Sequence, residues 1–305
     1  MTVAAALAAA RARGVAALDG QLLLARLLAT TRTRLISADE RTLSRAEARQ
    51  WSAWLERRLA GEPVAYLLGE KEFHGLLLEV DADVLVPRPE TELLVDWASE
   101  LIAALTSTRS GADDRPGRGA DGPPLRGAGD RPGRGADDRR IRAIDLGTGS
   151  GAIALALKRA HPGAAVVASD VSPAALAIAR RNAERLGLAI ELVEASWWHG
   201  LEGRRFELAV ANPPYIAAGD PHLAALRHEP LASLTPGGDG LGALREVIAG
   251  ARSPLVSGGW LLVEHGFDQG AAVRDLLATA GFAAIATRRD LAGLERTTGG
   301  RRPAD

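Results

Sequence analysis

The stretch "IRAIDLGTGSGAIALAL", residues 141–157, decides the fold class. Its first half is an apolar run of strand length, and its second half has the spacing of a buried helix. Between them stand three glycines, Gly147, Gly149 and Gly151. Glycine lets the backbone turn sharply and leaves room for a ligand because it has no Cβ. The stretch therefore predicts a strand, a tight turn open to a ligand, and a helix.

Further strands alternate with helical segments from there to the C-terminus. The strand-like runs are "AVVASD", "IELVEA", "FELAVAN" and "WLLVEHG". The clearest helix begins at the cap residue Ser172 with Pro173 in first position, and Gly187 ends it. Alternation of this kind is typical of a Rossmann-like α/β fold with a doubly wound parallel sheet, in which ligands bind beyond the carboxyl ends of the strands.

The glycine turn fits two cofactors. Gly147, Gly149 and Ala152 satisfy a dinucleotide-binding pattern, so an NAD-binding module is an alternative. Asp145, however, stands two residues before the first glycine, where a carboxylate would repel a pyrophosphate but could hold an amine-bearing ligand. This position favours S-adenosylmethionine.

The cofactor-binding residues expected at this edge of the sheet come from four strand ends. Asp170 closes the second strand and is placed to accept hydrogen bonds from ribose hydroxyls. In the loop "EASWWHG", we expect only Trp197 of the two adjacent tryptophans to reach the pocket, because neighbouring side chains at a strand end point opposite ways. The complete expected set is Gly147, Thr148, Gly149, Ser150, Gly151, Asp170, Trp197 and Asn212.

The hexamer "ANPPYI", residues 211–216, follows the fourth strand at the same edge. A planar NH2 group is a poor nucleophile, and two acceptors aimed at its hydrogens would orient it and stabilise the charge that develops. Asn212 offers a side-chain carbonyl and Pro213 a backbone carbonyl. Pro213 and Pro214 have no N–H and stiffen the loop, while Tyr215 can pack on the flat acceptor. We assign catalysis to Asn212, Pro213 and Tyr215. We assign substrate binding to Asn212, Pro213, Pro214 and Tyr215.

Three segments are expected. Residues 1–72 read as a helical domain, with a capping box at Ser44 and a tryptophan-containing apolar stripe predicted to be core. Residues 73–90 read as a β-hairpin linker, and residues 91–305 as the catalytic domain. Within the last, residues 107–140 contain the near-duplicates "GADDRPGRGAD" and "GAGDRPGRGAD", so poor in apolar residues that we expect a disordered insertion. The tail "TTGGRRPAD" shows no clear strand.

Composition excludes several classes of function. The 305 residues include no Cys, and the six His lack ligand-like spacing, so no metal site is expected. A formal net charge of −1 offers no general basic surface for nucleic acid. No apolar stretch is long enough to span a bilayer and no signal peptide is recognisable, so a cytoplasmic protein without membrane contact is expected.

"DLGTGSG", Asp170 and "NPPY", in this order on successive strands, resemble the class I methyltransferases that modify exocyclic or amide nitrogen. In that group the acceptor can be adenine, cytosine or a glutamine side chain. All three present the same planar NH2, and the tetrapeptide does not choose between them.

The rest of the chain resembles one family, the HemK-type peptide chain release factor glutamine methyltransferases. The resemblance rests on the helical N-terminal part together with "GEPVAYLLGEKEFHGLLLEV", "VLVPRPETELLV", "GGDGLGALREVI", "GGWLLVEHG" and "DLAGLER". It implies methyl transfer from S-adenosylmethionine to the glutamine of the GGQ motif of class 1 release factors, gripped in part by the helical domain. A monomer that needs no nucleic acid is expected. In "PRPETE", Arg88 and Glu90 either line the pocket entrance or serve only as a turn.

Two alternative substrates remain open. An N6-adenine methyltransferase of nucleic acid would need a base-flipping pocket and a target-reading domain, which the charge balance does not favour. A glutamine methyltransferase of a ribosomal protein would use identical acceptor chemistry.

Overall fold

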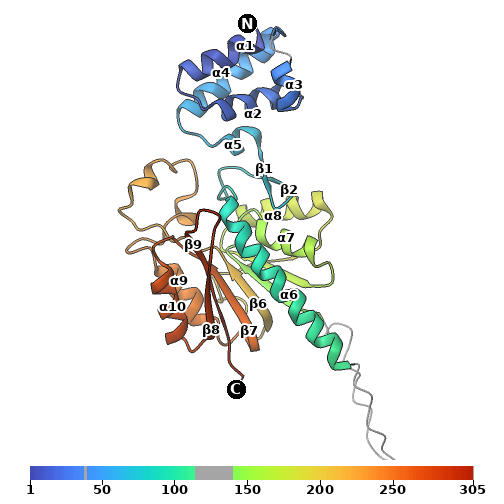
Figure 1. Cartoon of the computed structure of the whole chain (residues 1–305), viewed down its shortest axis with the longest axis vertical. Helices are drawn as coiled ribbons and strands as arrows, with labels where there is room; N and C mark the ends of the chain where they lie inside the picture. The colour runs from blue at the N-terminus through green and yellow to red at the C-terminus, as the bar shows by residue number, and fades with distance from the viewer. Residues whose placement is uncertain (38–39, 114–139, 305) are drawn as a thin grey trace, which may run out of the picture. The chain divides into compact units, whose positions relative to one another are not determined.

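A computed structural model describes residues 1–37, 40–113 and 140–304 (Figure 1). The chain forms two compact units. The first comprises Met1–Pro87 together with Gly219–Leu234, and the second comprises Arg88–Ala218 together with Thr235–Asp305. The chain therefore leaves the second unit after the "NPPY" loop, contributes sixteen residues to the first, and returns.

The first unit begins with five helices. These are α1 (Val3–Ala12), α2 (Ala17–Leu27), α3 (Arg32–Ser37), α4 (Arg45–Leu59) and α5 (Val64–Leu68). The capping box predicted at the start of α4 is confirmed: the Ser44 hydroxyl accepts from the Glu47 amide, and the Glu47 carboxylate accepts from the Ser44 amide. Of the predicted stripe, Trp51 and Leu55 are in the core, whereas Leu59 at the helix end is exposed.

A hairpin follows, formed by β1 (Glu70–Phe73) and β2 (Leu76–Glu79). His74 and Gly75 make its two-residue turn, both with positive φ, which is the geometry of a tight hairpin turn. The hairpin begins three residues before the expected range of 73–90 and ends well within it. The first strand, "EKEF", is hard to detect from the sequence because its one apolar residue is Phe73.

The segment Gly219–Leu234 packs on the first unit through polar contacts. Arg227 and His228 both hydrogen-bond to the carbonyl oxygen of Ala60, which ends α4, so two side chains satisfy a helix carbonyl that has no partner within the helix. The buried Glu229 carboxylate accepts from the Val86 amide at 3.0 Å. The expected catalytic segment 91–305 therefore includes residues that fold with the helical unit.

The second unit is built on a seven-stranded sheet in the order β5-β4-β3-β6-β7-β9-β8. The strands are β3 (Arg142–Leu146), β4 (Ala165–Asp170), β5 (Glu191–Glu194), β6 (Phe206–Ala211), β7 (Leu255–Glu264), β8 (Ala283–Arg289) and β9 (Glu295–Arg301). Neighbouring strands are parallel except that β9 lies antiparallel between β7 and β8. The Rossmann-like α/β fold expected from the alternating pattern is confirmed.

Helices cover both faces of this sheet (Figure 1). They are α6 (Glu92–Asp113), α7 (Ala152–Ala160), α8 (Pro173–Leu186), α9 (Gly242–Gly250) and α10 (Gly270–Thr279), and the short helix η1 (Pro89–Thr91) precedes α6. The main core lies under α9 and α10, where Leu244 and Leu277 pack with Ile144 and Val263 of the strands. The predicted caps of α8, Ser172 and Gly187, are confirmed.

The last two strands, β8 and β9, are not among the strand-like runs that the sequence pattern revealed, and β9 is the more unusual of the two. Its centre is "TTGG", and all four residues are buried. A Cβ at Gly299 would collide with Leu262 of β7 and would stand 3.0 Å from Trp97 of α6. The strand thus uses glycine where an ordinary strand uses an apolar side chain, because α6 packs directly on its backbone.

The start of the expected insertion is also corrected. Helix α6 continues past residue 107 to Asp113, and Arg109 from this helix reaches the sheet, where its guanidinium pairs with the buried Glu207 at 2.7 Å. Most of the expected insertion, residues 114–139, lies outside the described part of the chain. Among the described residues, no helix is long and apolar enough to cross a membrane.

The packing of β9 makes Gly299→Ala a test of the fold. Because the new methyl group must displace Leu262 or shift the strand, the variant should lose about 1–3 kcal/mol of unfolding free energy, as overpacked cores do. Urea unfolding measures the loss. Gly163→Ala is the matched control: a Cβ there meets no atom within 4 Å, so a change of similar size in both variants would contradict the packing argument.

Candidate active site

The strand register brings the predicted site residues to one edge of the sheet. Leu146 at the end of β3 pairs with Ser169 of β4 on one side and with Ala211 of β6 on the other. The glycine loop, Asp170 and Asn212 follow these three positions directly. They therefore share the carboxyl edge, where ligands bind in sheets of this kind.

The glycine loop is held mainly by its own backbone and by Asp170. Gly147, Gly149 and Gly151 all have positive φ, a conformation that other residues adopt only with strain. One carboxylate oxygen of Asp170 accepts from the Gly149 amide and the other from the Ser172 amide, each at 2.9 Å. This side chain ties the loop to the start of α8, and it is half-buried rather than fully exposed.

A second support of the loop was not predicted. Asn182 lies in α8, is completely buried, and donates its side-chain amide to the Ser150 carbonyl at 2.9 Å. The sequence did carry a signal, because Asn182 occupies an apolar-periodic position of a helix, where a buried amide needs a specific partner.

Asp145 lies beneath the loop. Its carboxyl group is completely buried, and one oxygen accepts from the Thr148 hydroxyl at 2.6 Å and from the Ala154 amide at 3.2 Å. The other oxygen has no hydrogen-bond partner among the described residues. Burial raises its pKa to about 7, against the opposing effect of these two donors. Through these two contacts the carboxyl group supports the turn from inside the domain.

The two adjacent tryptophans point in different directions, as expected. Trp197 lies beside the glycine loop, since a Cβ on Gly147 would stand 3.3 Å from its indole. Its own φ is +51°, a conformation unusual for a bulky residue. Trp198 instead donates its indole N–H to the Val247 carbonyl of α9 at 2.8 Å and packs against Gly250.

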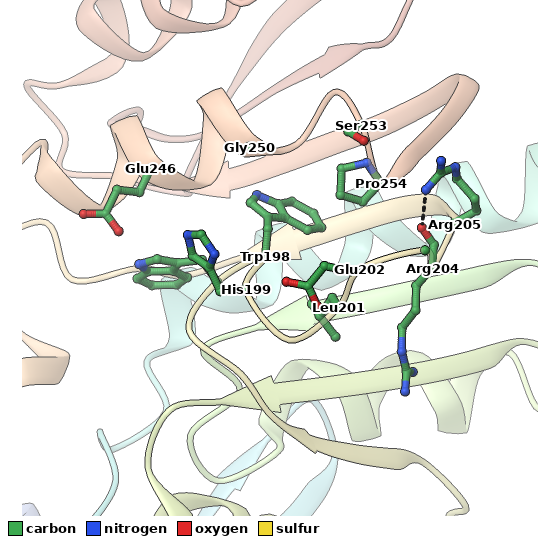
Figure 2. Close-up of a pocket in the computed structure, with 12 residues that line it drawn as sticks. Trp198, His199, Leu201, Glu202, Arg204, Arg205, Glu246, Gly250, Ser253 and Pro254 are labelled. Atoms are coloured by element: carbon green, nitrogen blue, oxygen red, sulfur yellow. Dashed lines mark hydrogen bonds between the residues drawn. The ribbon is translucent and has the colours of Figure 1, made fainter.

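A cavity of about 400 Å³ lies between α9 and the loop that carries these tryptophans (Figure 2). Arg204, Arg205 and Pro254 line its far end, close to the amino ends of β6 and β7. Figure 2 shows the Trp198 indole projecting toward α9. The cavity thus extends away from the carboxyl edge, and of its lining residues only Trp197 belongs to the predicted site.

Asn212 is anchored by a residue of "PRPETE". Its side-chain nitrogen donates to the hydroxyl oxygen of Thr91, in η1, at 3.1 Å. This contact directs the nitrogen toward Thr91, so Oδ1, on the other side of the amide, points away from that hydroxyl. Thr91 is buried and belongs to the same hexamer, of which our prediction considered only Arg88 and Glu90. Glu90 lines a separate cavity beside the β8–β9 turn.

The remainder of the motif is held in place from several directions. Pro213 is buried, and Pro214 and Tyr215 are half-buried. The carbonyl of Tyr215 accepts from the Gln269 side chain at 2.9 Å, and a Cβ on Gly240 would collide with the same carbonyl. The "GGDGLG" segment therefore uses glycine so that its backbone can pass close to the acceptor loop.

The Tyr215 hydroxyl lies 3.3 Å from a carboxylate oxygen of Glu264, the last residue of β7. Glu264 is completely buried, and burial raises its pKa to about 7 although the Thr91 and Tyr215 hydroxyls oppose the rise. Our prediction did not include this residue. The apolar run before it signals a strand end at the active edge, and that position could have drawn attention to a carboxylate there.

No cluster of three His, Cys, Asp or Glu side chains suited to a metal ion occurs within residues 1–37, 40–113 and 140–304.

The sheet order, the glycine turn and the "NPPY" loop define the class of the second unit as an α/β methyltransferase domain, and residues 136–272 match the family model "Methyltransferase small domain". Residues 2–69 match the family model "PrmC N-terminal domain". The chain is 43% identical to "Release factor glutamine methyltransferase" from Burkholderia pseudomallei (strain K96243), covering 96% of this chain and 94% of that one. A protein of the same name from Pseudomonas aeruginosa is 43% identical, covering 93% and 91%. The chain belongs to the release factor glutamine methyltransferase family.

Solved structures of similar fold are more distant. The hMettl16 catalytic domain in complex with MAT2A 3'UTR hairpin 1 has a TM-score of 0.53 at 15% identity, covering 86% of this chain and 84% of that one. At this identity the likeness concerns the fold alone.

The buried carboxyl of Asp145 predicts a pH-dependent effect of Asp145→Asn. Because its pKa is raised in the folded protein, the native state holds this proton between about pH 4 and 7, and the cost of a buried charge is complete above pH 7. The amide avoids that cost, so the variant should exceed the wild type by at least ~1 kcal/mol in unfolding free energy at pH 8 and by less at pH 5. Urea unfolding at both pH values gives the comparison; a difference that does not grow with pH would contradict the assignment.

Proposed function

We propose that this protein transfers a methyl group from S-adenosylmethionine to the side-chain amide nitrogen of the glutamine in the GGQ motif of class 1 peptide chain release factors. The observation that carries the proposal is the orientation of Asn212: its nitrogen is bound to Thr91, so its carbonyl is available to an incoming NH2 group. The names of the related proteins support a release factor glutamine as the owner of that group.

The acceptor motif suits an amide nucleophile. The lone pair of a glutamine amide is delocalised into its carbonyl, so its nitrogen must be oriented and the developing positive charge stabilised. We assign this task to Oδ1 of Asn212 and the backbone carbonyl of Pro213, each accepting one N–H. Pro213 and Pro214 bring no donor that would compete, and the Tyr215 ring can cover the flat face of the amide.

The glycine loop suits the cofactor. Gly149 has no atom within 4 Å of where its Cβ would stand, so the loop is open there, and Asp170 and Trp197 border it. We assign cofactor binding to Gly147 through Gly151, Asp170, Trp197 and Asn212. When bound, S-adenosylmethionine supplies an electrophilic methyl group. No strong base is needed in the motif, because the amide nitrogen loses its extra proton readily once it is methylated.

The substrate must be recognised largely outside this motif. We propose that the helical segment 1–72, which includes the match to the PrmC N-terminal domain, contributes to gripping the release factor, and that the protein acts as a monomer. No contact with nucleic acid is required for this reaction.

The proposal is tested by incubating the protein with methyl-labelled S-adenosylmethionine and a class 1 release factor, then locating the added mass by peptide mass spectrometry. One methyl group on the GGQ glutamine is expected. A release factor with alanine in place of that glutamine is the matched control and should remain unlabelled. Ribosomal proteins and duplex DNA are offered in parallel, and label in either of them with none in the release factor would overturn the proposal.

Asn212→Ala removes one of the two proposed acceptors. Turnover should fall at least ~100-fold, the scale of losing one preorganised transition-state contact. Arg205→Ala is the control and should leave turnover unchanged, because Arg205 precedes β6 whereas Asn212 follows it at the other end of the strand. Initial rates with the labelled cofactor measure both variants, and near-normal turnover of the alanine variant would exclude the acceptor role of Asn212.

A further inference from the structure

Glu264 is the least explained polar group at the active edge of the sheet. Its side chain is completely buried at the end of β7, yet one carboxylate oxygen makes no hydrogen bond among the described residues. The other oxygen lies 3.3 Å from the Tyr215 hydroxyl. Replacement by an apolar residue would avoid the cost of burying such a group, so its presence calls for a specific task.

The surroundings of Glu264 connect it to both ends of the acceptor motif. Thr91, whose hydroxyl accepts from the Asn212 side chain at 3.1 Å, also lies close enough to Glu264 to influence the pKa of its carboxyl. Tyr215 approaches from the other end of "NPPY". The Glu264 carboxyl group thus lies beside Thr91, which is the hydrogen-bond partner of Asn212, and beside the side chain of Tyr215.

The direction of these hydrogen bonds decides which way the Asn212 amide points. A threonine hydroxyl has one proton to donate and can accept in return. If the Thr91 hydroxyl donates its hydrogen bond to an ionised Glu264, it can only accept a hydrogen bond from Asn212. The Asn212 side chain must then turn its NH2 group inward and its carbonyl outward. If Glu264 instead donates a proton, Thr91 can donate to Asn212, and the amide is free to turn its carbonyl inward.

We propose that Glu264 is a positioning residue for the acceptor motif. In its ionised form it accepts a hydrogen bond from the Thr91 hydroxyl and thereby orients the Asn212 carbonyl toward the substrate amide, while it holds Tyr215 by accepting from the phenol hydroxyl. This inference rests on the proposed function. It adds Glu264 and Thr91 as residues that act through Asn212 and Tyr215 without touching the substrate.

The charged groups around Glu264 allow a change of protonation near neutral pH. Burial raises its pKa to about 7, Arg296 opposes that rise, and Glu90 adds to it. From the neighbouring strand, Thr297 pairs with Glu264 but brings no charge, and its buried hydroxyl has no hydrogen-bond partner in the described structure. Since the ionised form is the one that orients Asn212, turnover should fall as the pH is lowered through about 7.

The first test compares Glu264→Gln, Thr91→Val and Thr91→Ser. Glutamine keeps the shape of Glu264 but offers an NH2 donor at every pH, and valine removes the hydroxyl of Thr91. Each should lower kcat by roughly 10-fold or more, on the scale seen when the hydrogen-bond partners of metal-binding side chains are removed. Thr91→Ser keeps the hydroxyl and should retain near-normal kcat. The cofactor Kd should stay within a factor of two in all three.

Two further readouts separate positioning from loss of structure. The Glu264→Gln/Thr91→Val double variant should be no slower than the slower single variant, because both changes interrupt one chain of contacts. The decline of kcat below pH 7 should be absent in Glu264→Gln. It should be retained in Asp145→Asn, which is the control because the Asp145 carboxyl also has a pKa raised to about 7.

A spectroscopic measurement tests the geometry without the reaction. The sequence has two tyrosines, so protein labelled with ¹³C at the tyrosine Cζ gives two signals, and Tyr66→Phe assigns them. The Tyr215 signal should shift with an inflection near pH 7 that is absent in Glu264→Gln. Tyr66, whose hydroxyl donates to the Val84 carbonyl, is the internal reference and should show no such inflection.

Normal kcat and an unchanged acid limb in Glu264→Gln, or a wild-type Tyr215 signal without the inflection, would overturn the proposal. If Glu264→Gln failed to fold, Thr91→Val and the wild-type signal would still decide it. A wild-type protein that shows the inflection but does not methylate the release factor would refute the proposed function and leave the contacts around Glu264 established.

Discussion

The hydrogen bonds that Asp170 accepts from two backbone amides are the constraint on which the rest of the active edge depends. The chain must leave β3, turn through three glycines with positive φ and enter α7, and it must do so beside the start of α8. Asp170 joins Gly149 to Ser172 and so fixes both turns relative to one another. With these turns fixed, the register of β6 on β3 determines where Asn212 stands.

Buried polar side chains beneath this edge support the loops that lie on it. Asp145, Asn182, Thr91 and Glu264 are each at least nine-tenths buried, and each contacts a residue of the glycine loop or of "NPPY". Loops that must present backbone and amide groups to a ligand cannot satisfy all of those groups themselves. Supporting them from inside the sheet holds them rigid while the outward groups stay free, which is the requirement for a preorganised site.

The sequence located the residues at the carboxyl edge of the sheet better than the residues that support them. The glycines, Asp170 and "NPPY" stand at strand ends, and strand ends can be located from apolar periodicity alone. Thr91 and Asn212 are 121 positions apart, so their contact depends on tertiary packing that no local pattern encodes. Strand β9 escaped prediction for a related reason: Gly299 is required by Trp97 and Leu262, which come from elsewhere in the chain.

The choice of substrate cannot reside in the acceptor motif itself. A carbonyl pair that accepts from a planar NH2 group fits a glutamine amide as well as an adenine, so proteins that methylate either group can carry the same motif. What differs between such proteins must lie in the parts that bring one kind of NH2 to the motif. In this chain the match to the PrmC N-terminal domain and the segment Gly219–Leu234 both belong to the first unit. Since that segment follows "NPPY" after only three residues, a short stretch of backbone connects the first unit to the motif that we propose as the acceptor site.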